Sequence, residues 1–153
     1  MREDLFTTSQ DVPRSRVEVF RFFSDPANLE RLTPPWLGFR ILTPAPLPTG
    51  AGAVFEYRLK VHGLPLRWRT LIETWEEGHS FTDCQIQGPY ALWHHTHEFI
   101  DLPGGGTRIL DRVRFRVGWG PIGSLLTAIW VRQDVERIFQ FRQAIIERLF
   151  GAA

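Results

Sequence analysis

The hydrophobic pattern at the start of the chain predicts a strand followed by a short helix. Residues 3–12 alternate apolar and polar positions, as a half-buried strand does, and Pro13 ends this segment. Over residues 15–23 the apolar positions instead recur at helical intervals. Ser15 and Glu18 have the spacing of a capping box, so we expect Ser15 to cap this helix.

A second short helix and then a long series of strands are predicted next. Asp25 is a suitable N-cap residue, Pro26 is favoured at the first helical position, and Thr33-Pro34-Pro35 ends the helix. From residue 38 to residue 117 the pattern becomes strand-like and is interrupted by turns rich in Gly and Pro. Six strands fit between these turns, and their short connections indicate an antiparallel meander.

The last of these strands shows the clearest alternation of all. One face carries Ile109, Asp111, Val113, Phe115 and Val117, and the other carries Arg108, Arg112, Arg114 and Arg116. We therefore expect one face of the sheet to lie on the core and the other face to lie in water.

A long amphipathic helix is predicted at the end of the chain. No Gly or Pro interrupts residues 124–150, and apolar residues such as Val135, Ile138 and Phe139 recur near helical spacing. At 1.5 Å per residue this helix is roughly 40 Å long. No internal repeat is present, so residues 1–153 are expected to form a single domain.

The strand before the last one contains a cluster of histidines. His94, His95 and His97 are three of the five histidines in the chain. Because successive side chains on a strand alternate faces, His95 and His97 share a face with Trp93 and Phe99, while His94 lies on the other. Two imidazoles between two aromatic residues are compatible with a metal site, an acid/base pair or the polar floor of an apolar pocket.

The loop over residues 102–106 decides which face of this strand points inward. A five-residue loop places His97 opposite Asp111 and aromatic residues opposite one another, whereas a four-residue loop places His94 inside. We expect the five-residue loop, because it leaves neither His97 nor Asp111 without a polar neighbour.

Composition narrows the possible classes of protein. A chain of 153 residues can bury a core without disulfides, and its single cysteine, Cys84, favours a reducing compartment. A net charge of +1 is too small to indicate nucleic-acid binding. The chain begins with charged residues and has no apolar run long enough to cross a bilayer, so we expect a soluble, cytoplasmic protein without integral membrane association.

Six short segments match a known family. They are residues 23–29, 32–36, 66–70, 81–85 and 88–90 and the pattern Trp93-x-His95-x-His97-x-Phe99. With the order of elements, they make the whole chain resemble the START-like (SRPBCC, pollen-allergen-like) superfamily, and within it the bacterial ligand-binding, cyclase- or dehydrase-like proteins. The resemblance implies an α+β helix-grip fold, in which a seven-stranded curved antiparallel sheet wraps around the long C-terminal helix, with two short helices between strands 1 and 2. It also implies a hydrophobic cavity between sheet and helix.

The alternation of the strands nominates the residues that face this cavity. We expect its apolar walls to be formed by Tyr57, Trp68, Trp93 and Phe115. We expect its polar anchors to be His95, His97, Asp111, Asp83 and Gln85. Thr70, Phe99 and Val113 complete the predicted ligand-binding set. Such a site suits a hydrophobic, partly oxygenated small molecule, for example a lipid, a polyketide or an isoprenoid.

Other interpretations of the histidines stay open beside ligand binding. His95 and His97 could bind Zn²⁺ with Asp111 or Asp83 as a third ligand, but no third histidine shares their face, so we favour hydrogen-bonded cavity histidines and expect no metal or other cofactor. As a catalytic pair, His97 oriented by Asp111 could move a proton in a dehydration or an aldol-type cyclisation, although a structural pair is the commoner case. A third possibility is an interaction module whose cavity is filled by its own side chains.

The remaining features have ordinary explanations. The arginines of the last strand could follow phosphates, but a solvated face paired with carboxylates is more common. Trp36 and Trp119 are expected at the mouth of the cavity, where they either gate a ligand or pack over the core. Trp130 and Phe141 lie off the apolar stripe of the long helix, which leaves a homodimer open.

Overall fold

The computed structural model describes residues 3–118 and 120–153, and the side chains of residues 120–128 lie outside this description. In the described part the strands are β1 (Asp4–Val12), β2 (Arg40–Ile41), β3 (Val54–Val61), β4 (Leu64–Glu76), β5 (Ser80–Gln87), β6 (Tyr90–Asp101) and β7 (Thr107–Val117). The helices are α1 (Arg16–Phe23), α2 (Leu29–Leu32) and α3 (Gly120–Phe150), with 3-10 turns η1 (Pro26–Asn28) and η2 (Pro35–Leu37).

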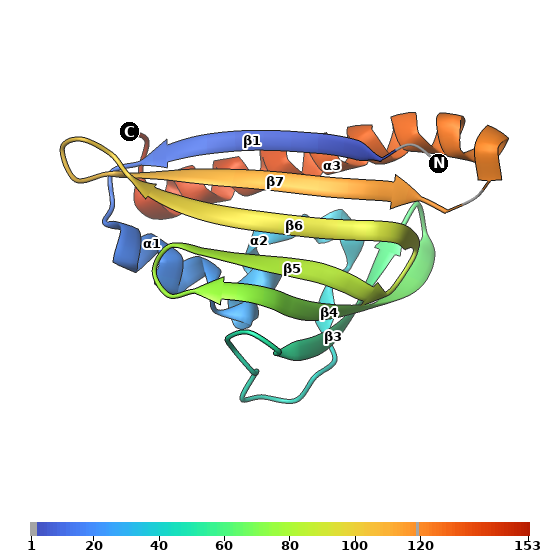
Figure 1. Ribbon diagram of the computed structural model, residues 1–153, viewed down its shortest axis with the longest axis horizontal. Helices are drawn as coiled ribbons and strands as arrows, with labels where there is room; N and C mark the ends of the chain where they lie inside the picture. The colour runs from blue at the N-terminus through green and yellow to red at the C-terminus, as the bar shows by residue number, and fades with distance from the viewer. Residues whose placement is uncertain (1–2, 119) are drawn as a thin grey trace.

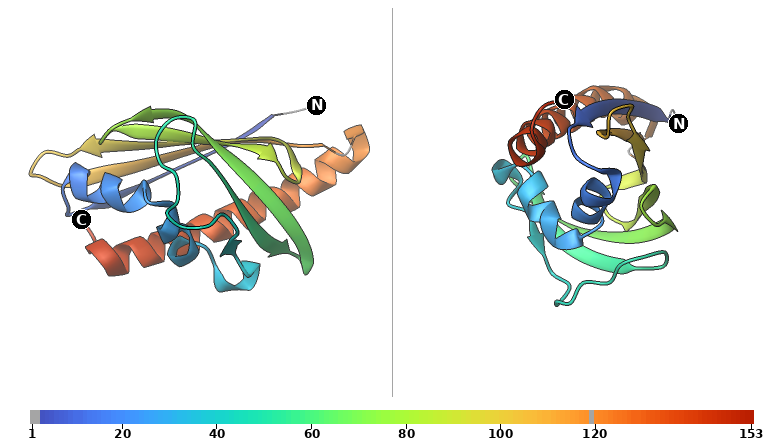
Figure 2. Two further views of the ribbon diagram at one scale, coloured as in Figure 1. Left: turned by 90° about the horizontal axis from the view of Figure 1, so that it is seen from below. Right: turned by 90° about the vertical axis from the view of Figure 1, so that its left-hand side faces the viewer.

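All of these strands form one antiparallel sheet in the order β1-β7-β6-β5-β4-β3-β2. The first strand pairs with the last, and α3 packs against β1 and β7 (Figure 1). Figure 2 shows the sheet bending around α3 and the short helices. The predicted helix-grip fold is therefore confirmed.

The β6–β7 hairpin has the predicted register. His97 lies opposite Asp111, and the loop between the strands is closed by a hydrogen bond of 2.8 Å from the Leu102 amide to the Gly106 carbonyl. This register turns His95 and His97 toward the interior, where only 5% of either residue is exposed.

The outer face of β7 is a solvated face, as predicted. Its arginines at positions 108, 112 and 114 each form an ion pair with a carboxylate, those of Asp11, Glu98 and Glu3 respectively. These contacts lie on the side of the sheet that faces away from α3, so they hold neighbouring strands together at the surface.

The short helices follow the predicted caps but not the predicted lengths. Ser15 accepts a hydrogen bond from the third amide of α1, and Asp25 caps the segment that follows. That segment is a 3-10 turn and then one turn of α-helix rather than a single helix. Asn28 interrupts it, because its side-chain amide donates to the Phe22 carbonyl at 2.9 Å and ties the chain back to α1.

The long helix begins earlier than predicted. It starts at Gly120 instead of Ser124, because Pro121 falls in the first turn, where a backbone N–H has no partner to lose. Trp119, which was expected at the cavity mouth, lies outside the described residues. None of the helices in the described part is long and apolar enough to span a membrane.

A phenylalanine-rich core fills one end of the space between sheet and helix. The core consists of Val12, Val19, Phe20, Phe23, Leu32, Phe81, Phe99, Ile109, Ile146 and Phe150. The Phe20 ring lies edge-on to those of Phe81 and Phe99, with centroids 6.1 and 5.4 Å apart, an arrangement that aromatic pairs favour. Helix α1 thus closes this end.

Candidate functional site

A cavity of about 650 Å³ lies at the other end of the same space, between the sheet and α3. Its aromatic wall contains Tyr57 of β3, Trp68 of β4, and Tyr90 and Trp93 of β6. The Trp68 and Trp93 rings meet edge to face at 5.2 Å, while Tyr57 stacks on Trp68 at 5.9 Å. The volume lies within the range of sites for small organic ligands. The chain's own side chains therefore leave this space open.

Strand alternation explains which side chains line the cavity. Phe55, Tyr57, Leu59 and Val61 of β3 and Trp68, Thr70 and Ile72 of β4 all do so, as the period of two predicts. Because α3 packs on β1 and β7 at the far edge of the curved sheet, the inward residues of β3 and β4 face it across open space.

Residues from three elements form the rim of the cavity. Trp36 of η2 lines it although 59% of the residue is exposed, and its ring packs edge-on against Phe141 of α3 at 5.8 Å. His62, in the β3–β4 turn, contacts Asp134 of α3 through Nε2 and Oδ2 at 2.8 Å. At the rim, η2 and the β3–β4 turn thus contact α3 through these side chains.

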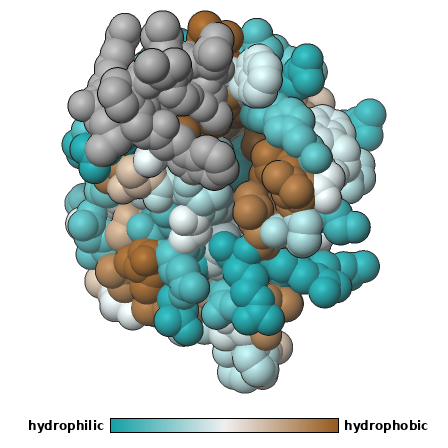
Figure 3. Space-filling view, turned by 90° about the vertical axis from the view of Figure 1, so that its right-hand side faces the viewer, coloured by the Kyte–Doolittle hydropathy of each residue, from teal (hydrophilic) through white to brown (hydrophobic). Residues whose placement is uncertain are grey.

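The end of the molecule where α3 begins has a mixed surface. In Figure 3 apolar side chains gather there in separate patches among hydrophilic ones. On α3 itself Ile129 and Trp130 are exposed. Scattered exposed apolar residues are normal on a monomer, so the homodimer stays a prediction.

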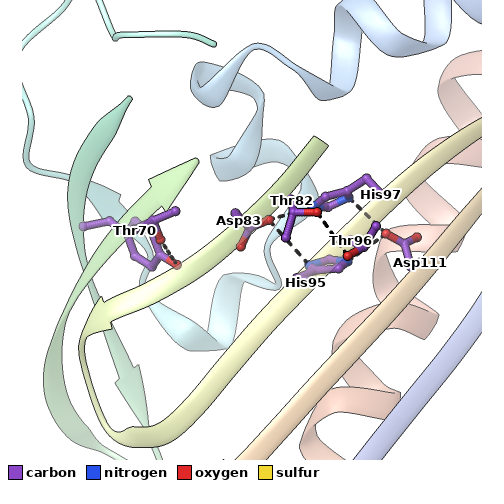
Figure 4. A network of polar contacts seen from close by, with 8 residues as sticks. Thr70, Thr82, Asp83, His95, Thr96, His97 and Asp111 are labelled. Carbon is purple, nitrogen blue, oxygen red and sulfur yellow. Dashed lines mark hydrogen bonds and ion pairs between the residues drawn. The ribbon is translucent and has the colours of Figure 1, made fainter. Parts of the chain in front are cut away.

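Three largely buried side chains, Asp83, His95 and His97, form the polar floor of the cavity, and Asp111 supports the two histidines from behind (Figure 4). His95 Nε2 donates to Asp111 Oδ1 at 2.8 Å, and His97 Nε2 donates to Asp83 Oδ2 at 2.7 Å. His97 Nδ1 lies 3.1 Å from the same Asp111 oxygen, an ion-pair contact that lacks the alignment of a hydrogen bond. Asp111 therefore contacts both imidazoles on the side away from the cavity. Asp83 contacts His97 from the side of the cavity.

Aromatic rings hold the two imidazoles in place. The His95 and His97 rings are 3.7 Å apart, and His97 also stacks on Phe81 at 4.3 Å. Phe139 of α3 meets His95 edge-on at 5.5 Å. The histidines are thus packed between the phenylalanine-rich core and the helix, which fixes their orientation.

Both carboxyl groups of the floor are ionised. Burial by itself raises the pKa of Asp111, but its contacts with His95 and His97 outweigh burial and hold that pKa well below the usual value. Burial opposes ionisation of Asp83 as well, yet the hydrogen bond from His97 keeps the pKa of Asp83 low. The floor therefore presents two negative charges to the histidines.

The two histidines are shifted in opposite directions. Burial, together with the charge of His97, lowers the pKa of His95. Burial also opposes protonation of His97, but Asp111 and Asp83 together raise the pKa of His97 above its ordinary value. The surroundings thus favour a proton on His97 over a second proton on His95. Since neutral His95 donates Nε2–H to Asp111, its Nδ1 carries a lone pair, and this atom lies 3.8 Å from Asp83 Oδ2, beyond hydrogen-bond distance.

Asp83, His95 and His97 also offer donor atoms of the kind that bind Zn²⁺, and these atoms lie within 4.8 Å of one another. His97 Nε2 and Asp83 Oδ2, however, are only 2.7 Å apart. Two ligands at 2.0–2.1 Å from a tetrahedral zinc would be separated by roughly 3.3 Å. The spacing is that of a hydrogen bond between the two side chains.

The structure divides the predicted site residues into two groups. Those that line the cavity are Tyr57, Trp68, Thr70, Asp83, Trp93, His95 and His97. Those that lie outside its wall are Gln85, Phe99, Asp111, Val113 and Phe115. Phe99 belongs to the phenylalanine-rich core, whereas Val113 and Phe115 pack under α3 with Val135 and Phe139. Asp111 contacts the cavity only through the two histidines.

Gln85 has a structural position rather than a place in the wall. Its side-chain amide accepts from the Tyr90 amide at 3.1 Å and donates to the Tyr90 carbonyl at 2.7 Å. These bonds bridge the β5–β6 turn. A Cβ atom at Gly88 would lie 2.4 Å from Gln85 Oε1, so only glycine fits beside this bridge.

Sequence reasoning missed the buried arginine of the site. Arg142 of α3 lines the cavity and is only 8% exposed. It follows Val135 by seven residues, Ile138 by four and Phe139 by three, so it stands in the apolar stripe of the helix. A charged residue within such a stripe was the signal that could have identified it.

Several hydrogen-bond donors at the cavity lack acceptors in the described part of the chain. Trp68 Nε1 and Arg142 Nε are buried without a partner. Burial raises the pKa of Tyr57, which keeps its hydroxyl neutral. The hydroxyl oxygen accepts a hydrogen bond from Thr70 Oγ1 at 3.4 Å. The Tyr57 O–H itself can therefore donate to a ligand. The apolar wall thus contains donors that suit a ligand oxygen.

Comparisons with known proteins agree with this fold. The family model described as polyketide cyclase / dehydrase and lipid transport matches residues 12–141. TTHA0849 from Thermus thermophilus is 16% identical, with a TM-score of 0.70 over 95% of this chain and 99% of that one. The Zhui aromatase/cyclase from Streptomyces sp. R1128 is 14% identical, with a TM-score of 0.66 over 99% and 100% of the two chains. At such identities the likeness concerns the fold alone.

A third structure is similar over part of its length. The nucleoside-diphosphate sugar epimerase from Corynebacterium glutamicum is 28% identical, with a TM-score of 0.64, and the match covers 94% of this chain but only 29% of that protein. No curated protein sequence matches this chain.

Proposed function

The chain belongs to the polyketide cyclase / dehydrase and lipid transport family, and we propose that it binds a hydrophobic, partly oxygenated small molecule in the cavity between the sheet and α3. Candidate ligands are lipids, polyketides and isoprenoids. In this proposal the chain is a single ligand-binding domain that acts in the cytoplasm.

One observation carries this proposal: a cavity of about 650 Å³ has apolar walls and a few buried donors without acceptors. Aromatic walls favour an apolar body, because burying apolar surface yields about 25 cal/mol per Å². Unpaired donors such as Trp68 Nε1 favour a ligand that brings an oxygen, since leaving a buried polar group without a partner costs about 1–3 kcal/mol.

Filling the cavity tests the proposal. Leu59→Trp places a large side chain in the space, whereas Leu64→Trp adds the same side chain at an exposed site outside it. We expect the fluorescent probe 1-pyrenebutanol to bind the wild type and Leu64→Trp equally, and Leu59→Trp at least tenfold more weakly. Native mass spectrometry of the purified protein would detect a ligand that is retained. A wild type that binds no apolar probe and carries no ligand would contradict the proposal.

The opposite pKa shifts of His95 and His97 support a second candidate function, that of a cyclase or dehydratase. Paired groups whose pKa values are pushed apart are typical of acid/base catalysis. In a dehydration, His95 Nδ1 would take the proton from the carbon next to a carbonyl. The C–H electron pair would form the new C=C bond, and the β-hydroxyl would leave as water with the His97 proton, which Asp83 would pass on.

Deuterium exchange tests this second candidate without knowledge of the substrate. In D₂O the base would exchange the methyl protons of bound 1-acetylpyrene, which mass spectrometry measures. We expect His95→Gln to lower the exchange rate by about 10²-fold or more, the usual contribution of a general base, while His94→Gln on the outer face has no effect. Equal rates with and without the wild-type protein would exclude His95 as a base.

A further inference from the structure

Arg142 is a buried charge at the cavity without an ionic partner among the described residues. Its guanidinium is always protonated and offers five N–H donors. Nevertheless it forms no hydrogen bond or ion pair with any residue of 3–118 or 129–153, although it is 8% exposed and lines the cavity. Its Cζ lies over the Phe139 ring, 5.0 Å from the ring centroid.

Several exposed arginines of this chain have the ionic partner that Arg142 lacks. On the outer face of the sheet, Arg108, Arg112 and Arg114 each have a carboxylate partner although they lie in water. A buried charge needs a partner far more than an exposed one does, because it has lost its hydration. The cation–π contact with Phe139 covers one face of the guanidinium and leaves its N–H groups without acceptors.

Neither Asp83 nor Asp111 is the missing ionic partner of Arg142. Asp83 is held by His97 at 2.7 Å, and Asp111 is held by His95 at 2.8 Å. Arg142 acts on Asp83 only through space and makes no ion pair with it. None of residues 3–118 or 129–153 therefore supplies the acceptor that the buried Nε–H of the guanidinium lacks.

We propose that Arg142 binds a carboxylate of the ligand, so that the cavity takes an amphipathic organic acid. This inference rests on the proposed function and names the chemical class of the ligand. The planar guanidinium matches a carboxylate with two parallel hydrogen bonds. The apolar body of the acid lies against the aromatic wall, and the Tyr57 hydroxyl and Trp68 Nε1 are further donors. A monoanion suits this position better than a phosphate, because Asp83 and Asp111 already place negative charge in the floor.

A matched pair of probes tests the proposal. 1-Pyrenebutanoic acid and 1-pyrenebutanol share one apolar body and differ in the carboxylate. We expect the wild type to bind the acid about 10- to 100-fold more tightly than the alcohol, as a buried charge-assisted hydrogen bond would give. Arg142→Met should remove this preference and leave alcohol binding within about threefold. Arg142→Lys should keep part of it, and Arg148→Met, at an exposed site of the same helix, should keep all of it.

Thermal unfolding without ligand separates a binding role from a structural one. If Arg142 awaits a ligand, Arg142→Met should unfold at the wild-type temperature or above it, because an unpaired buried charge is removed. A variant that unfolds at a lower temperature and loses both probes equally would show that Arg142 supports the fold, and would overturn the proposal. A wild type that binds acid and alcohol equally would also overturn it, but would leave hydrophobic binding intact. Failure of both probes to bind the wild type would contradict the proposed function itself.

Discussion

The two ends of the space between sheet and helix differ although the same strand alternation builds both. At the α1 end, Phe20 and Phe23 reach in from the helix and pack against Phe81 and Phe99 into a solid core. At the other end, the inward residues of β3 and β4 face α3 across a cavity of about 650 Å³. Inward-facing apolar residues are therefore not enough to fill a core; a helix must also deliver side chains into the same volume.

The polar residues of the site lie on the border between these two ends. His97 stacks on Phe81, which belongs to the solid core, and both residues line the cavity. The solid end thus provides the rigid packing that a precise hydrogen-bond network needs, while the hollow end provides access.

The largest expected effect comes from removing a side chain at the solid end. Phe99→Ala should lower the free energy of unfolding by about 3–5 kcal/mol, because it creates a new cavity in a packed core. Urea-induced unfolding measures this loss. Leu59→Ala at the hollow end is the matched variant, and it should lose no more than about 2 kcal/mol, because it only widens an existing cavity. Equal losses would mean that the two ends are packed alike.

A second prediction concerns the border and its dependence on pH. The pKa of His97 is raised in the folded protein, so its stabilisation is complete below the unfolded pKa near 6.5 and is lost as pH rises through the folded pKa. The pKa of His95 is lowered, so stability falls as pH drops below about 6.5. The free energy of unfolding should therefore be greatest near pH 6.5, with slopes of up to about 1.4 kcal/mol per pH unit on either side.

Variants of the two histidines show which residue causes the pH dependence of stability on each side of pH 6.5. Urea unfolding from pH 5 to pH 9 should show that His97→Gln removes the loss on the alkaline side and His95→Gln the loss on the acid side. An unchanged alkaline slope in His97→Gln would be incompatible with the proton that we assign to His97.

The smallest expected effect lies at the rim. Trp36→Ala should change the free energy of unfolding by less than about 1 kcal/mol, because most of this residue is already exposed. The same change removes one side of the rim, so 1-pyrenebutanol should leave the cavity faster, as stopped-flow fluorescence would measure. An unchanged release rate would show that the probe does not leave past Trp36.

The sequence predicted the fold and the inward histidines well, because both follow from local rules. Turn residues mark the ends of the strands, and the five-residue loop at 102–106 sets the β6–β7 register in which His97 faces Asp111. The register between β5 and β6 was left open by the sequence pattern, although it sets Asp83 opposite His95 and brings it within reach of His97. The contact between His97 and Asp83 was therefore missed.

The limits of the cavity could not be predicted from alternation. A period of two tells which face of a strand is inward, but Phe99 and Trp93 share that face and end in different surroundings. Whether an inward residue meets a packed helix or open space depends on where α1 docks, which is a matter of tertiary structure.

The bridge between Gln85 and Tyr90 has a consequence for how this protein can evolve. Because a Cβ atom at position 88 would lie 2.4 Å from Gln85 Oε1, a side chain there would push Gln85 away from Tyr90. A relative with any other residue at position 88 would lose the bridge between Gln85 and Tyr90 and would build its β5–β6 turn in another way. Such a relative would also hold Tyr90 at a different height in the aromatic wall. Gln85 and Gly88 together are thus a marker in sequence alignments for relatives that keep this turn and the position of Tyr90 in the aromatic wall.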